Sequence, residues 1–117
     1  MTMRLSQRAL ERDRVIELVS AEESAGELFR FEYIARTFTP APREHVHTQQ
    51  EERVEVLEGT LRCRVGGVEY RLRPRETITI PAGTPHVVWN DDPAGSRSIG
   101  EYRPALNARA MFRGYLE

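Results

Sequence analysis

Three histidines and one glutamate stand out because their side chains are common metal ligands and their spacing is regular. His45 and His47 are two residues apart, Glu52 follows five residues after His47, and His86 lies in a second stretch beginning at Pro81. In a β-strand, side chains at i and i+2 share a face, so His45 and His47 would direct both imidazoles the same way. The chain has three histidines in all, and this pattern uses each of them. The spacing predicts one metal centre assembled from two separate stretches.

Strand parity selects the acidic ligand. A turn through residues 48–50 would let a new strand begin near Glu51, and Glu52 would then share a face with Val54 and Val56. We interpret Glu52 as the ligand and Glu51, the rival acid, as a solvated turn residue. Imidazole nitrogen and carboxylate oxygen suit Fe, Mn, Ni, Zn or Cu better than Ca or Mg, so the expected cofactor is one divalent transition-metal ion.

Length, charge and cysteine content limit the other possibilities. The 117 residues predict one domain, and the single cysteine, Cys63, excludes an intrachain disulfide framework and a cysteine zinc cluster. The net charge of −1 is spread without a basic stripe, and no apolar run approaches the ~18 residues of a membrane span. We therefore expect no nucleic acid or membrane partner. The N-terminus lacks an apolar signal core, which favours a cytoplasmic protein.

Alternation of apolar and charged residues predicts a series of short β-strands. The pattern is clear in residues 29–35, 61–65 and 68–72, and Gly66-Gly67 suits the tight turn of a hairpin. Further strands are expected at 15–20, through His45 and His47, from Glu51, around Ile78 and Ile80, from His86 to Asn90, and over 97–104. Such a run of seven to nine strands without crossover helices predicts an all-β sandwich or barrel.

The single domain divides into three parts in this interpretation. Residues 1–25 form an N-terminal arm and the first strand, residues 26–104 form the barrel, and residues 105–117 form a short C-terminal helix. The arm, residues 1–14, is polar with sparse apolar positions. The apolar positions expected on the helix are Ala105, Leu106, Ala110, Met111 and Tyr115.

The two histidine-bearing stretches resemble the two sequence motifs of the cupin superfamily. The first motif is His-x-His, four residues, Glu, six residues, Gly; the second is Pro-x-Gly, two residues, His, three residues, Asn. The matching residues are His45, His47, Glu52 and Gly59, then Pro81, Gly83, His86 and Asn90. The resemblance, to small single-domain bacterial cupins of the cupin 2 conserved-barrel type, spans roughly residues 26–106. Thr39 and Arg75 replace the glycines that usually open the motifs, and Glu76 replaces a common aspartate.

This resemblance implies a double-stranded β-helix, or jelly roll. It also implies a metal ion inside the barrel, held by His45, His47, Glu52 and His86. Cupins include dioxygenases, isomerases, decarboxylases, sensors and storage proteins without catalysis, so the fold does not select one function.

The ligand set and the expected pocket favour chemistry on a small organic molecule. Four protein ligands leave one or two open positions on a five- or six-coordinate ion, where a substrate or dioxygen could bind. We predict a dioxygenase-like, metal-dependent oxidoreductase; the alternatives are a non-catalytic small-ligand-binding or sensor cupin, or a metal-dependent isomerase. Tyr33 and Tyr70 are the candidate catalytic residues, as acids or hydrogen-bond donors. The expected pocket wall consists of Phe31, Tyr33, Val54, Val56, Cys63, Tyr70, Ile78 and Val88.

A small jelly roll also exposes strand edges, which favour association unless something covers them. We therefore expect a homodimer. The strand at residues 15–19 and the outer face carrying Trp89, whose parity is opposite to that of His86, are the expected contacts.

Overall fold

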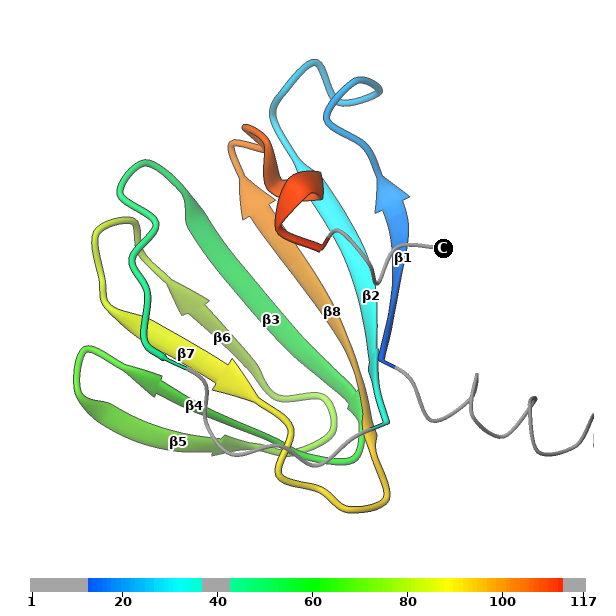
Figure 1. Ribbon diagram of the computed structural model, residues 1–117, viewed down its shortest axis with the longest axis vertical. Coiled ribbons are helices and arrows are strands. Elements are labelled where there is room, and N and C mark those ends of the chain that lie inside the picture. Colours follow the sequence, from blue (N-terminus) through cyan, green and yellow to red (C-terminus); the bar gives the residue numbers. More distant parts are fainter. Residues whose placement is uncertain (1–12, 37–42, 113–117) are drawn as a thin grey trace, which may run out of the picture.

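The computed structural model describes residues 13–36 and 43–112, which form eight β-strands and one short 3-10 helix (Figure 1). Their order along the chain is β1 (Arg14–Val19), β2 (Phe29–Ala35), β3 (Glu51–Glu58), β4 (Leu61–Val65), β5 (Val68–Leu72), β6 (Thr77–Ile80), β7 (His86–Trp89), β8 (Ser96–Arg103) and η1 (Ala108–Phe112). The strand predictions from residue 51 onward match these elements closely.

The strands form two antiparallel sheets. The larger sheet has the order β1-β2-β8-β3-β6, and the smaller has the order β5-β4-β7. Figure 1 shows the two sheets as separate layers, with β4, β5 and β7 on one side and β8, β2 and β1 on the other. Two antiparallel sheets, with almost no helix in residues 13–36 and 43–112, confirm the predicted all-β jelly roll.

Apolar alternation explains how the two layers adhere. Val54 and Val56 of β3 are buried between polar neighbours, and they pack with Leu61 and Cys63 of β4 in one core cluster. Because β3 and β4 belong to different sheets, this cluster joins the layers. Burial of these side chains is the main force that holds the sheets face to face.

Two turns show how the backbone handles left-handed conformations. Gly66 and Gly67 have φ of 56° and 84°, as expected for the tight turn between β4 and β5. Arg75, which stands where the motif usually has glycine, adopts φ of 73°. For a residue with a side chain this conformation costs about 1–2 kcal/mol. The turn before β6 therefore keeps the backbone conformation that favours glycine, in spite of this cost.

The C-terminal helix begins later than the sequence pattern suggested. Leu106 has φ of 47°, which a right-handed helix cannot include, so the helical turn begins only at Ala108. Ala105 and Ala108 are buried, whereas Leu106 and Met111 are exposed. No helix among the described residues is long and apolar enough to cross a membrane.

A second core cluster lies where η1 covers the larger sheet. It joins Val15 of β1, Phe29 and Phe31 of β2, Tyr102 of β8 and Ala108 of η1. Figure 1 shows η1 lying against the β2 and β8 strands. Residues 1–12 of the predicted arm and residues 113–117 of the predicted helix lie outside the described residues.

Candidate metal centre

The four predicted ligands come together although they belong to distant segments. Their donor atoms all lie within 4.8 Å of one another. That spread is close to the separation of two donors on opposite sides of one ion with bonds of about 2.1 Å. We refer to His45, His47, Glu52 and His86 as the His/Glu cluster. The structure thus brings together every residue that the sequence assigned to the metal.

The segment carrying His45 and His47 is not the regular strand that the spacing suggested. It forms a single antiparallel bridge, in which the backbone N–H groups of His45 and His86 each donate to the other residue's carbonyl at 2.9 Å. The Gly83 N–H donates to the carbonyl of His47, also at 2.9 Å. Backbone contacts with the second motif, rather than a strand, therefore hold both imidazoles in place.

Glu52 reaches the cluster by strand parity. It lies near the start of β3, on the face that also buries Val54 and Val56, and only 7% of it is exposed. Glu51 precedes it and is exposed, as expected for the rival acid. Strand pairing places Glu52 between Ile80 of β6 and Tyr102 of β8.

His86 is the most deeply buried member of the cluster, with 1% exposed. Its Nδ1 is 2.8 Å from the Thr84 carbonyl, which only accepts hydrogen bonds, so Nδ1 carries a proton. Nε2 then faces Oε1 of Glu52 at 3.0 Å. Burial tends to lower the pKa of His86, but the hydrogen bonds with Glu52 and Thr84 outweigh it and raise the pKa.

His47 supplies the strongest sign that the cluster suits a cation. Its Nε2 is buried and, among the described residues, has no hydrogen-bond partner; it lies 3.6 Å from Oε1 of Glu52. Burial lowers the pKa of His47, and the neighbouring His45 and His86 lower it further against the attraction of Glu52. A buried nitrogen without a partner costs about 1–3 kcal/mol, which a metal ion would offset. The donor set therefore fits a divalent transition metal.

Tyr102 is a residue of the site that the sequence analysis missed. It faces Glu52 directly across the pairing of β8 with β3, and its ring lies edge-on to the His47 imidazole with centroids 5.2 Å apart. Burial, followed by the nearby charge of Glu52, raises the pKa of Tyr102 well above its usual range. Parity along residues 97–104 could have shown which face Tyr102 occupies, but not that β8 pairs with β3.

The two tyrosines proposed as catalytic candidates lie in other environments. The Tyr33 hydroxyl donates to Oδ2 of Asp13 at 2.9 Å. Tyr70 is 44% exposed on β5, an edge strand of the smaller sheet, where it pairs with Cys63. Cys63 itself is buried, and burial, aided by Glu52 and Glu69, raises its pKa to about 11. Its thiol therefore stays protonated at neutral pH.

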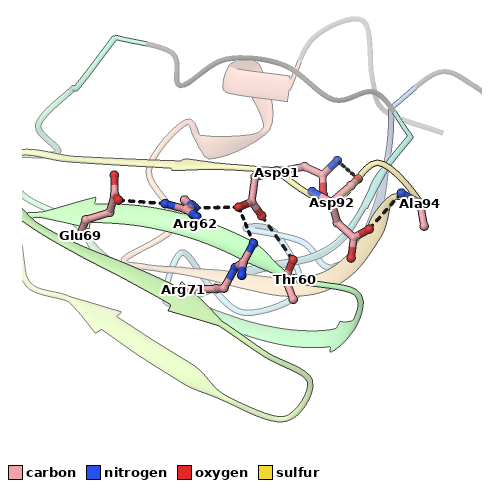
Figure 2. Close-up of polar contacts among 8 residues, drawn as sticks. Thr60, Arg62, Glu69, Arg71, Asp91, Asp92 and Ala94 are labelled. Atoms are coloured by element: carbon pink, nitrogen blue, oxygen red, sulfur yellow. Dashed lines mark hydrogen bonds and ion pairs between the residues drawn. The ribbon is translucent and has the colours of Figure 1, made fainter.

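A group of hydrogen bonds to Asp91 fixes the chain on the outer face, where β7 ends (Figure 2). Asp91 accepts hydrogen bonds from Arg62 at 2.7 Å, Arg71 at 3.2 Å and Thr60 at 3.3 Å. Burial tends to raise the pKa of Asp91, but these arginines outweigh it and lower the pKa. These hydrogen bonds anchor the C-terminal end of β7, the strand that begins with His86.

Trp89, which ends β7, and Asn90, which follows it, have structural contacts. The Asn90 amide donates to the Asp92 carbonyl, and its oxygen accepts from the Asp92 N–H. Trp89 lies across from Arg62, and the Arg64 guanidinium is 5.9 Å from the Trp89 ring centroid. Trp89 is half-buried on the outer face, as its parity predicted.

Comparison with protein families gives a match that contains both histidine-bearing stretches. Residues 36–97 match the sequence profile of the cupin domain family, Cupin_2. No curated protein sequence matches the chain closely enough to count as a relative.

Solved structures with the same fold are numerous. The chain is similar to KdgF from Halomonas sp., with 16% identity, a TM-score of 0.70 and 83% of each chain covered. It is also similar to the TT1209 protein from Thermus thermophilus, with 26% identity, a TM-score of 0.66, and 80% of this chain and 85% of that one covered. A recombinant oxalate oxidase in complex with glycolate shares 19% identity at a TM-score of 0.63, over 79% of this chain and 51% of the oxidase.

Proposed function

This chain belongs to the cupin domain family, and from that premise we propose that it is a metal-dependent oxidoreductase acting on a small organic molecule. The His/Glu cluster would hold one divalent transition-metal ion. The observation that carries the proposal is the His47 Nε2 atom, which is buried beside three other donors and, among the described residues, lacks a hydrogen-bond partner.

The chain's own groups would prepare the site before any substrate arrives. The Thr84 carbonyl holds the proton on Nδ1 of His86, which leaves the lone pair of Nε2 directed at the cluster. Glu52 supplies the only negative charge among the four donors. A bound ion would supply Lewis acidity and, for Fe, Mn or Cu, a change of oxidation state.

Charge identifies the substrate class to test first. Three neutral imidazoles and one carboxylate around a divalent ion leave a net charge of about +1, which favours an anionic ligand such as a carboxylate or enolate. Access is provided at His45, which is exposed, whereas His86 is buried. The oxalate oxidase with a similar fold was solved with glycolate, a small carboxylate, which supports beginning with that class.

A non-catalytic binding or sensor role is the second candidate, and the environment of Glu52 favours it over an isomerase. Burial, followed by the charge of Glu52, raises the pKa of Tyr102 well above its usual range, and the Gln50 amide donates to the carbonyls of Pro104 and Ala105 at 2.9 Å. The phenol therefore keeps its proton, and the Gln50 amide is committed to the protein itself. An isomerase needs a positioned group that moves a proton, whereas oxidation at the ion or simple ligand binding does not.

Oxygen consumption distinguishes these candidates. The metal-free protein would be reconstituted anaerobically with Fe(II) and then exposed to oxygen with a panel of small carboxylates, aromatics and thiols. We expect substrate-dependent oxygen uptake that Glu52→Ala abolishes. Equal uptake by both proteins, or no uptake across the panel while a ligand still binds, would favour the binding or sensor role.

We also propose that the protein is a homodimer. Among the described strands, β1 and β6 are the edges of the larger sheet and β5 is an edge of the smaller, whereas the other edge, β7, is bridged to His45. Leu18 on β1 and Val68 on β5 are large apolar side chains that are 43% and 52% exposed. Edges of this kind are usually covered by a partner. Light scattering should give twice the 13.5 kDa chain mass, and a value of 13.5 kDa at micromolar concentration would contradict the dimer.

A further inference from the structure

We propose that Tyr102 is a positioning residue, which holds the Glu52 carboxylate in the orientation that a metal ligand needs. This inference rests on the proposed metal site, but it concerns a residue outside the family motifs. Tyr102 directly faces Glu52 across the pairing of β8 with β3, and only 5% of it is exposed. Burial and the neighbouring Glu52 carboxylate raise the pKa of the phenol, so its hydroxyl keeps a proton that it can donate.

The phenol ring is itself held in a fixed place. Phe31 stacks on it with centroids 5.7 Å apart and planes inclined by 17°, and Phe112 of η1 packs at 6.3 Å. The His47 imidazole meets the ring edge-on at 5.2 Å. Tyr102 therefore lies beside two members of the His/Glu cluster: it faces Glu52 across the paired strands, and its ring meets His47.

Gly100 makes this arrangement possible. It pairs with Phe31 on β2 and with Val54 on β3, two residues before Tyr102 on the same face. A Cβ at Gly100 would overlap the Phe31 ring. The missing side chain lets Phe31 lie flat over β8, where it supports the ring of Tyr102.

This geometry has a direct consequence for metal binding. A free carboxylate rotates about its last bond, and ordering it on binding an ion carries an entropic cost. A hydrogen bond to the carboxylate from a rigid, buried donor removes much of that freedom in advance. Partners of this kind, which touch a ligand rather than the ion, typically change metal affinity by about 10–100-fold.

Substitution of Tyr102 by Phe tests the role of the hydroxyl while keeping the ring. The affinities of wild type and Tyr102→Phe for Zn²⁺ and Co²⁺ would be measured by competition with a chelator. We expect Tyr102→Phe to bind both ions roughly 10–100-fold more weakly. The matched control is Tyr33→Phe, which removes a hydroxyl bonded to Asp13, a carboxylate outside the cluster. Its affinity should stay within about twofold of wild type, since no contact to a ligand is removed.

A double-mutant cycle shows whether Tyr102 acts through Glu52. In the Glu52→Ala background, the Tyr102→Phe substitution should change the affinity of the remaining histidines by less than about twofold. A full effect in that background would contradict a role through the carboxylate. Incorporation of 4-aminophenylalanine at position 102, which restores a donor, should recover most of the affinity.

The outcomes separate this inference from the proposed function. Unchanged affinity in Tyr102→Phe, or a lower thermal stability of its metal-free form with unchanged affinity, overturns the positioning role and leaves the metal site standing. Absence of metal binding by wild type overturns both. Normal metal binding without oxygen uptake overturns the oxidoreductase alone. If Tyr102→Phe does not fold, equal affinities of wild type and the 4-aminophenylalanine variant support the role, and a loss in that variant contradicts it.

Discussion

Glu52 and Glu101 are two buried carboxylates on opposite faces of the same sheet, and they differ in the cations that meet them. Their side chains are 9% and 8% exposed, and they lie on adjacent paired positions of β3 and β8. Glu101 faces outward, with Arg30 Nε at 3.7 Å and Arg103 Nη2 at 3.6 Å. Glu52 faces inward, toward His86 at 3.0 Å and His47 at 3.6 Å.

The difference shows why one carboxylate is structural and the other is a candidate ligand. Arginine stays protonated at any physiological pH, so Glu101 has a permanent countercharge. A histidine can lose its proton near neutral pH, and burial lowers the pKa of His47, so Glu52 has no permanent countercharge. A buried charge without a permanent countercharge is costly, and either a proton or a metal ion inside the cluster relieves that cost.

The largest expected effect is on metal affinity. Glu52→Gln removes the charge but keeps the shape, and we expect it to weaken Zn²⁺ or Co²⁺ binding by more than about 100-fold, beyond the range for partners that do not touch the ion. Glu101→Gln is the matched control on the outer face and should remain within about threefold of wild type. Chelator competition measures both. Similar losses in the two variants would mean that overall sheet stability, rather than ligation, controls the affinity.

The inner face was predictable from the sequence to the extent that parity and motif spacing determine it. Glu52 shares its face with Val54 and Val56 as alternation required, and its preference over Glu51 follows from the same rule. The spacing around His45 and His47 identified the right residues, although a backbone bridge to His86 positions them instead of a strand.

The remainder of the site depends on contacts between distant strands. Tyr102 faces Glu52 only because β8 lies beside β3, and the pairing of strands so far apart in the chain is not visible in local periodicity. Tyr70 was predicted to line the pocket by alternation alone, yet its strand is at a sheet edge and the ring is exposed. Parity gives the face of a residue, whereas the position of its strand in the sheet decides whether that face is covered.

A smaller effect is expected from a substitution at Gly100, which lies on the inner face of the sheet, on the side of Glu52 and not of Glu101. Gly100→Ala places a methyl group against the Phe31 ring, so the ring must shift. We expect the free energy of unfolding to fall by about 1–3 kcal/mol, as for other overpacked cores. Urea denaturation of the metal-free protein measures the change.

A second substitution tests the cause of that loss. Phe31→Leu replaces the ring that the methyl group meets with a smaller side chain, so the double variant should be more stable than the sum of the two single losses predicts. Strict additivity would show that the cost of Gly100→Ala arises in the β8 backbone and not in its contact with Phe31.

The smallest effect concerns protonation of the metal-free protein. The pKa of His86 is raised through its hydrogen bonds with Glu52 and Thr84, in spite of burial, and that of His47 is lowered chiefly by burial. Nitrogen-detected NMR titration should therefore show His86 gaining its proton above, and His47 below, the pH of ~6.5 at which an unperturbed histidine titrates.

The stability contributed by protonated His86 is fully present below about pH 6.5 and is lost as the pH rises through its raised pKa. The effect of His47 has the opposite sign, because the folded protein disfavours the protonated form of His47. Its contribution to stability is lost as the pH falls below about 6.5. Glu101→Gln should leave both titrations in place, because arginines satisfy that carboxylate on the outer face. If His86 titrated below His47, the hydrogen bond between Glu52 and His86 would not control the protonation of His86. That hydrogen bond would then not be the feature that distinguishes Glu52 from Glu101.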